Sequence, residues 1–158
     1  MTALVLCAGR VKEKWLREGI DEYQKRLSRL LKTDIQEVDD LPEPETSSPE
    51  LEEQIKRREG EALLRQLKNG DEVIALCVEG ELVDSPGVAK MLASCAMNGR
   101  RPVFVIGGSL GLSDEVKRRA AKKISLGRVT LPHRLARLVL MEQIYRAAKI
   151  NAGEKYHK

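Results

Sequence analysis

Short apolar runs alternate along this chain with longer segments of helical periodicity, and this alternation constrains the fold more than any other feature. Residues 3–8, 73–78 and 103–106 are continuously apolar, as expected for strands that are buried on both faces of a parallel sheet. Residues 33–38 alternate apolar and polar side chains, which predicts a strand nearer the sheet edge. Because strands and helices alternate, we predict an α/β fold with a mostly parallel sheet flanked by helices.

The segments between these runs carry helix signals. Residues 12–31 place apolar side chains at helical spacing between charged ones, which predicts an amphipathic helix. Ser48, Asp84 and Ser113 each stand where a helix would begin, and proline or acidic residues follow them. Three further helices are therefore predicted at these positions, and a last one over residues 134–150.

The remaining segments are short, which favours a single domain. Residues 39–48 combine acidic side chains, two prolines and small polar residues, a composition that predicts a loop too short to link two domains. Residues 124–131 resemble a short strand that continues into a second loop. A chain of 158 residues can bury about two-thirds of its unfolded surface around one core, so we expect one domain over residues 1–158.

The last predicted helix is unusually apolar. Residues 135–144 are apolar on nearly all sides and are interrupted only by Arg137, Glu142 and Gln143. A helix of this kind in a small protein has more than one packing partner. A second copy of the chain is the simplest source of that partner, so we predict a symmetric homodimer built on this helix.

The net charge of +4 conceals an asymmetry along the chain. Residues 1–113 carry 16 Lys and Arg against 20 Asp and Glu, a net charge of −4, whereas residues 114–158 carry 12 against 4, a net charge of +8. A basic C-terminal third on a slightly acidic body is the pattern expected of a protein that binds RNA or another polyanion. The alternative is a basic helix face that is only solvated.

Several functional classes are disfavoured by what the sequence lacks. No apolar run approaches the roughly 20 residues that span a membrane, and the first residues do not form a signal peptide, so we expect a cytoplasmic protein. Cys7, Cys77 and Cys95 form no CxxC pair and are interpreted as small hydrophobic residues in a reducing compartment. Without a hydrolytic carboxylate pair or a metal-ligand cluster, we expect neither a hydrolase nor a metal site.

Three loops follow the carboxyl ends of predicted strands, where α/β sheets bind ligands. They span residues 77–80, 107–112 and 126–132. The second contains the sequence GGSLG, which matches neither the dinucleotide-binding GxGxxG spacing nor a phosphate-binding loop with its lysine. Its glycines fit either the close approach of a ligand or a tight turn. The third loop could hold a ligand through backbone N–H and C=O groups, or it could be a plain strand-to-helix turn.

A few side chains near these loops are candidates for chemistry. His133, at the start of the last helix, fits a general base or an RNA contact, and equally a capping role. Glu142 and Arg146 lie one turn apart and form either an ion pair or, with Tyr145, part of a site. Tyr156, beside His157 in the C-terminal tail, could stack on a nucleotide, although terminal residues are often uninformative.

Taken together, these motifs resemble the bacterial RlmH family of the SPOUT superfamily. The resemblance rests on IGGSLGL at residues 106–112, LPH at 131–133, RLVLMEQIYRA at 137–147 and the final YHK, and it extends over the whole chain. It implies a methyltransferase that uses S-adenosylmethionine to methylate N3 of a pseudouridine in 23S ribosomal RNA. It also implies a homodimer and a deep C-terminal trefoil knot, here at roughly residues 102–150.

The resemblance also implies which residues hold the cofactor. The family binds S-adenosylmethionine in the loops of the knot, and the matching positions here are Leu76, Gly107, Leu126, Gly127, Arg128, Val129, Thr130 and Leu131. Gly127 and Arg128 stand where members of the family vary, which recognition through backbone atoms tolerates. The family's usual VGK after the first strand is AGR at residues 8–10, which keeps a cation in third position.

Roles in the reaction follow as hypotheses from the same resemblance. His133 and Glu142 are assigned base or orienting roles, and His157 a catalytic role in closing the tail over the site. Substrate placement is assigned to Arg137, Tyr145, Arg146 and Tyr156. The expected substrate is large-subunit rRNA in the assembled ribosome, because so small a chain carries no separate RNA-reading domain. Two alternatives are a non-catalytic RNA-binding α/β domain and an enzyme that binds a different nucleotide.

Overall fold

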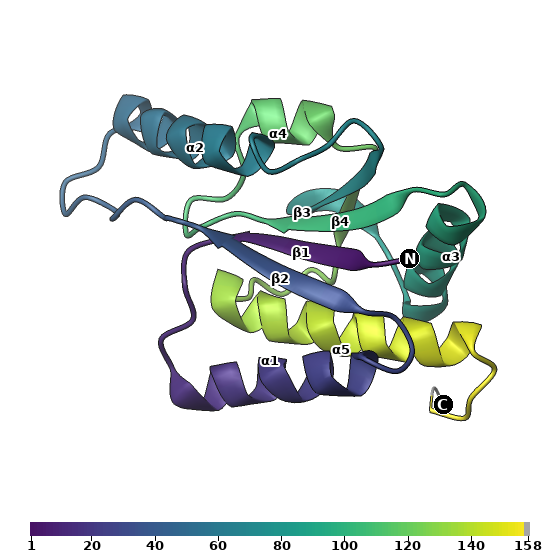
Figure 1. The fold of residues 1–158 in the computed structure, drawn as a ribbon. Helices are drawn as coiled ribbons and strands as arrows, with labels where there is room; N and C mark the ends of the chain where they lie inside the picture. Colours follow the sequence, from purple (N-terminus) through teal and green to yellow (C-terminus); the bar gives the residue numbers. More distant parts are fainter. Residues whose placement is uncertain (157–158) are drawn as a thin grey trace.

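The computed structural model describes residues 1–156, in which strands and helices alternate from one end to the other (Figure 1). In chain order the elements are β1 (Ala3–Ala8), α1 (Lys14–Leu27), β2 (Thr33–Val38), α2 (Pro49–Leu64), β3 (Asp71–Leu82), α3 (Ser85–Met97), β4 (Arg101–Ile106), α4 (Asp114–Arg119), β5 (Lys122–Ser125) and α5 (His133–Asn151).

The strands form one sheet of order β2-β1-β4-β3-β5 in which every neighbouring pair is parallel. The continuously apolar runs become β1, β3 and β4 at its centre, and the alternating run becomes the edge strand β2. The predicted α/β fold with a parallel sheet is confirmed. All carboxyl ends of a parallel sheet point the same way, so the loops that follow β1, β3 and β4 gather at one edge.

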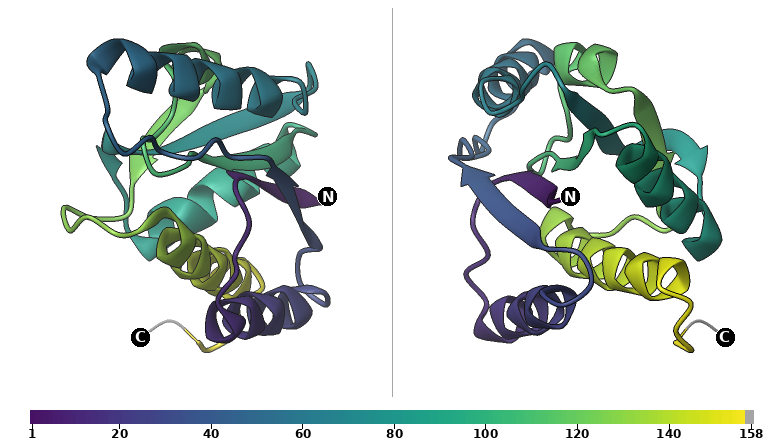
Figure 2. Two further views of the ribbon diagram at one scale, coloured as in Figure 1. Left: turned by 90° about the vertical axis from the view of Figure 1, so that its left-hand side faces the viewer. Right: turned by 45° about the vertical axis from the view of Figure 1, so that its right-hand side comes forward.

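Helices cover both faces of the sheet, which explains why the central strands are apolar throughout. α2 and α4 lie over one face, while α1, α3 and α5 lie over the other (Figures 1 and 2). Alternate residues of each strand enter two separate clusters: Leu4 and Val105 pack toward α2 and α4, whereas Val5 and Phe104 pack toward the three other helices.

The predicted helix starts are confirmed in their cap geometry. The side chains of Ser48, Asp84 and Ser113 accept hydrogen bonds from the backbone N–H groups of Leu51, Gly87 and Val116, which satisfies donors that the first helical turn leaves free. Several boundaries differ from expectation. α1 covers Lys14–Leu27 rather than residues 12–31, and β3 extends to Leu82 rather than to residue 78. β5 ends at Ser125, so most of residues 124–131 is loop.

α5 finds its packing partners within its own chain. It lies beside α1 on one side and α3 on the other, against the sheet (Figure 2), and Leu140, Met141 and Ile144 are fully buried. The apolar composition that suggested a second subunit is thus largely satisfied by these contacts. None of the helices within residues 1–156 combines the length and apolar character needed to cross a membrane.

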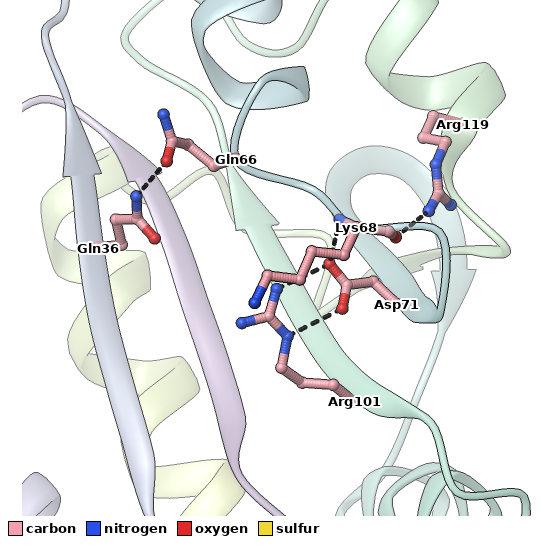
Figure 3. A network of polar contacts seen from close by, with 6 residues as sticks. All are labelled: Gln36, Gln66, Lys68, Asp71, Arg101 and Arg119. Carbon is pink, nitrogen blue, oxygen red and sulfur yellow. Dashed lines mark hydrogen bonds and ion pairs between the residues drawn. The ribbon is translucent and has the colours of Figure 1, made fainter.

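At the amino end of the sheet, a buried carboxylate is fully hydrogen-bonded by its neighbours. Arg101 at the start of β4 donates two hydrogen bonds of 2.8 Å to the carboxylate of Asp71 at the start of β3, and the N–H of Lys68 donates a third of 2.7 Å (Figure 3). Burial would raise the pKa of Asp71, but these hydrogen bonds outweigh it and lower the pKa. Arg119 joins α4 to the same corner through the carbonyl of Lys68.

The structural elements that the expected knot would involve are all present, with β5 beside β3 and α5 returning beneath the sheet (Figure 1). The threading of the chain through a trefoil knot, at roughly residues 102–150, stays a prediction.

Burial raises the pKa of the Cys7 thiol to about 12, and Cys7 and Cys95 are buried. Both behave as the small apolar residues that were expected.

Candidate active site

A cleft of about 890 Å³ opens at the carboxyl ends of the strands. Its walls come from the ends of β3 and β4, the segments that follow β4 and β5, and the first turn of α5. This volume lies in the range of about 300–1,000 Å³ that is typical of small-molecule sites. The three loops singled out in the sequence therefore meet around one cavity.

The glycine loop after β4 forms one wall, and two of its glycines stand where a side chain would be strained. A Cβ on Gly107 would lie 2.6 Å from the carbonyl carbon of Gly111, and Gly111 itself has a φ of +87°, which L side chains rarely adopt. A bridge between Gly108 and Gly111 closes the loop. Without side chains, the backbone of Gly107 and Gly108 can approach a ligand in the cleft closely.

The end of β3 forms another wall, through an irregularity that the sequence did not reveal. Leu76 and Glu81 both pair with Ile124 of β5, so residues 77–80 leave the ladder and return to it. A Cβ on Gly80 would lie 2.5 Å from the backbone carbon of Ile124, which explains the glycine. Leu76, Cys77, Val78 and Glu79 line the cleft, where we expected only a strand end and a turn.

The loop between β5 and α5 forms the mouth. Ser125 Oγ donates to the carbonyl of Gly127 at 2.8 Å and accepts from its N–H at 3.3 Å, which fixes the start of the loop. Seven of the eight positions predicted to hold the cofactor line the cleft; they are Leu76, Gly107, Leu126, Gly127, Val129, Thr130 and Leu131. Arg128 is exposed and does not line it.

His133 also lines the cleft, at the first residue of α5. Its Nε2 is buried and has no hydrogen-bond partner among the described residues. Burial, and next the positive charge of Arg134, lowers the pKa of His133. The imidazole is therefore neutral at pH 7 and able to accept a proton.

Arg137, one turn further along α5, does not face the cleft. It is 2% exposed, and its guanidinium donates to Glu37 of β2 at 2.6 Å and to the carbonyl of Gly9 at 3.0 Å. These bonds attach the first turn of α5 to the ends of β1 and β2. The side chain assigned to substrate placement is thus occupied inside the protein.

The other predicted residues gather in the second half of α5 and just beyond it. Arg146 contacts Glu142 at 2.7 Å and lies 4.6 Å from the ring centroid of Tyr156, and the hydroxyl of Tyr156 donates to Glu142 at 3.3 Å. Tyr145 packs edge-on against Tyr156 at 4.9 Å. Glu142 lies nine residues after His133, about 13 Å along the helix axis, so this cluster and the cleft are separate within one chain. His157 lies outside the described residues.

Two kinds of residue near the cleft carry no signal in the sequence that assigns them to a site. Lys56 of α2 and Lys117 of α4 line its edge, but both lie in charge-rich helices where nothing distinguishes them. Glu59 of α2 is 5% exposed, yet the sequence around it is a continuous run of charged residues. Only its face on the helix, which requires the helix to be placed, separates it from its solvated neighbours.

The chemistry available is therefore that of a backbone-lined cleft with one neutral imidazole at its rim. Within residues 1–156, no three His, Cys, Asp or Glu side chains gather where they could hold a metal ion. Glycine backbone, apolar side chains such as Leu76 and Leu126, and a proton acceptor suit a nucleoside-containing ligand beside a group that must lose a proton.

Comparison with known proteins agrees with this geometry. Residues 1–157 match the family model described as predicted SPOUT methyltransferase. The chain is 50% identical over 155 residues to a protein of Bifidobacterium animalis subsp. lactis, covering 98% of each chain, and 46% identical over 159 residues to one of Clostridioides difficile, covering both completely. Each of these relatives is named ribosomal RNA large subunit methyltransferase H.

Solved structures show the same fold at much lower identity. A methylase family protein from Haemophilus influenzae matches with a TM-score of 0.55 at 12% identity, over 99% of this chain and 71% of that one. One from Neisseria gonorrhoeae matches with a TM-score of 0.52 at 13% identity, over 91% and 82%. From the full-length family match and the relatives near half identity, the chain belongs to the SPOUT methyltransferase family, and within it to the RlmH family.

Proposed function

We propose that this chain is an S-adenosylmethionine-dependent methyltransferase that methylates N3 of a pseudouridine in 23S rRNA. The observation that carries the proposal is the cleft at the carboxyl ends of β3 and β4, where three backbone loops meet beside His133. The full-length relatives named as large-subunit rRNA methyltransferases support the substrate class. The basic C-terminal third, with its net charge of +8 over residues 114–158, suits a polyanionic partner.

The residues of the cleft fit S-adenosylmethionine. Gly107 lines the cleft with backbone atoms alone, and the backbone groups of residues 126–131 suit the edge of an adenine. Leu76, Leu126 and Leu131 provide apolar walls. We assign the cofactor to these residues together with Gly127, Val129 and Thr130; Arg128, on the exposed side of the loop, would contribute backbone atoms only.

When bound, S-adenosylmethionine supplies an electrophilic methyl group on a sulfonium sulfur. The protein must then align N3 of the base with that methyl group and remove the imide proton. We assign His133 to proton removal, because its side chain lines the cleft and its lowered pKa favours the neutral imidazole. The imidazole would take the proton from N3 and leave N3 the electron pair that accepts the methyl group, while the electrons of the S–CH3 bond would return to sulfur as a neutral thioether.

Arg137 acts in this scheme through position rather than by direct contact. Its bonds to Glu37 and Gly9 hold the first turn of α5, and that turn carries His133. We infer that Arg137 places the base, and through it the substrate, while its own charge is neutralised by Glu37.

We further propose that two protomers share each site. The cluster of Glu142, Tyr145, Arg146 and Tyr156 begins at the middle of the 19-residue helix α5, about 13 Å along the axis from His133. A homodimer with antiparallel α5 helices would bring this cluster, and the tail that contains His157, to the partner's cleft. The RNA-contacting and tail-closing roles assigned to these residues therefore depend on a dimer.

The decisive experiment is mass spectrometry of rRNA nucleosides from cells with and without this protein. Loss of N3-methylpseudouridine on deletion, restored by the wild-type chain and not by His133→Gln, is the expected result. Unchanged nucleosides would overturn the assignment. In vitro, assembled ribosomes should be methylated faster than free rRNA.

Calorimetry separates the enzyme from its two alternatives. S-adenosylmethionine should bind the purified protein, and ATP should bind at least tenfold more weakly (roughly a 1.4 kcal/mol difference). No binding of either ligand would favour the RNA-binding domain without catalysis, and equal binding of ATP would favour a different nucleotide enzyme.

A further inference from the structure

Glu59 is a buried carboxylate without a cation. It lies on α2 with 5% of its surface exposed, and no Lys, Arg or His within the described residues comes within ion-pair distance of it. Its one hydrogen bond there comes from the backbone N–H of Leu41, 2.9 Å from Oε2. Burial raises the pKa of Glu59. Burial of a carboxylate without a cation costs folding free energy. Such groups are therefore found mainly where they have a functional role.

The carboxylate packs directly behind the glycine loop. A Cβ on Gly108 would lie 2.9 Å from Oε1 of Glu59, so Glu59 occupies the space where residue 108 would otherwise carry a side chain. Gly108 in turn lines the cleft, while Glu59 does not. The backbone of Gly108 therefore separates Glu59 from a bound ligand by a single layer of atoms.

The next residue of α2 contacts the other end of the same loop. A Cβ on Gly60 would lie 2.3 Å from Oγ of Ser113, and Ser113 caps the start of α4. Two successive residues of α2 thus touch both ends of residues 108–113. α2 and α4 lie side by side over this face of the sheet (Figure 1), so the helix forms the rear support of the loop.

The partner of Oε2 belongs to another loop at the same edge. Leu41 lies in the acidic segment after β2, next to Asp40, whose carboxylate oxygen would be 2.9 Å from a Cβ on Gly9 at the end of β1. One carboxylate therefore joins the loops that follow β2 and β4. Arg137 anchors α5 to Gly9 from the other side.

We infer that Glu59 is a positioning residue of the cofactor site, which holds the glycine loop of residues 107–111 against the loop after β2. The inference rests on the proposed binding of S-adenosylmethionine in the cleft. Removal of the side chain leaves the N–H of Leu41 without its acceptor and opens space behind Gly108. The glycine loop then loses its fixed position, and a ligand held by backbone atoms loses affinity.

Two substitutions at Glu59 distinguish loss of the charge alone from loss of the whole side chain. Glu59→Gln keeps the size of the side chain and an oxygen that can accept from Leu41, so it should bind S-adenosylmethionine within about twofold of wild type. Glu59→Ala removes both and should weaken binding about tenfold. Titration calorimetry gives both values.

Two control variants exclude trivial explanations. Glu61→Ala removes an exposed acid from the same helix and should leave cofactor affinity unchanged. Val73→Ala creates a cavity at the fully buried start of β3, outside the lining of the cleft. It should lower the melting temperature as much as Glu59→Ala or more and leave affinity unchanged. A merely structural Glu59 would behave like Val73.

Hydrogen exchange provides a local measurement. In Glu59→Ala, amides of residues 39–46 and 106–113 should both exchange faster than in wild type, whereas Val73→Ala should not change these two segments together. Cofactor affinity of Glu59→Ala within twofold of wild type, or equal weakening in Val73→Ala, would overturn the inference. Failure of the wild-type protein to bind S-adenosylmethionine would instead overturn the proposed function.

Discussion

Buried polar groups are hydrogen-bonded at one end of the β3–β4 pair and left unpaired near the other. At the amino end, the Asp71 carboxylate receives three hydrogen bonds from Arg101 and Lys68. At the carboxyl end, the same two strands open into a cleft of about 890 Å³. There the buried Nε2 of His133 has no partner among the described residues.

This difference indicates that the amino end of the sheet contributes mainly to stability and the carboxyl end mainly to ligand binding. Buried polar groups are normally paired, because an unpaired one costs roughly 1–3 kcal/mol. The amino end follows this rule. The carboxyl end leaves an imidazole unpaired and crowds glycines into a loop, features that do not stabilise the free protein and that suit a ligand. Substitutions at the two ends should therefore have separable effects.

The largest effect is expected from His133→Gln. The variant removes the proposed base while keeping a side chain of similar polarity, so methyl transfer should slow by about 10²- to 10⁴-fold. Affinity for S-adenosylmethionine should change by less than about threefold. Single-turnover methylation of ribosomes and calorimetry measure the two quantities. A full rate in the variant would remove His133 from the reaction.

Gly107→Ala should act on binding instead of chemistry. Its Cβ would meet the backbone of Gly111 at 2.6 Å, and backbone cannot move aside as a flexible side chain does. Cofactor affinity should fall about 100-fold, as misplacement by about an ångström can cause. The matched control is Gly70→Ala at the amino end, where a Cβ meets nothing within 4 Å; it should bind normally.

Asp71→Ala tests the other end of the sheet. It removes the partner of Arg101 and the acceptor of the Lys68 N–H, and should lower the free energy of unfolding by about 2 kcal/mol. Chemical denaturation measures the loss. The affinity of the folded variant for S-adenosylmethionine should match that of wild type, and a parallel loss of affinity would contradict the division between the two ends.

The smallest effect concerns pH and His133. Its pKa in the folded protein lies below the ordinary value of 6.5, so the unfolded chain takes up the proton more readily. The stability that neutral His133 contributes is therefore lost as pH falls from 6.5 toward the lower pKa of the folded protein. The unfolding free energy of His133→Gln relative to wild type should increase between about pH 8 and pH 5.5. A constant difference across this range would contradict the lowered pKa.

Local signals in the sequence were sufficient for much of the fold. The apolar runs identified β1, β3 and β4, and the capping residues Ser48 and Ser113 identified the starts of α2 and α4. These predictions succeeded because the signals lie within a few residues of one another. The three ligand loops followed from the rule that parallel strands end at one edge.

Long-range features could not be predicted in this way. The irregularity at residues 77–80 depends on pairing with Ile124, and the role of Glu59 depends on which side of α2 meets the glycine loop. Arg137 and Glu142 lie on the same apolar helix and were grouped with one site, but helix geometry separates Glu142 from the cleft while Glu37 occupies Arg137. Sequence distance and spatial distance differ most along a long helix.

That helix has a further consequence for how this chain can vary. α5 carries His133 at its first residue and Glu142, which accepts a hydrogen bond from Tyr156, at its middle. One residue inserted between them would advance the far end by about 1.5 Å and rotate it by about 100°. The length of α5 thus fixes both the distance and the relative orientation of these two groups. Surface loops of this protein can change length, whereas an insertion or deletion within α5 would put its two ends out of step.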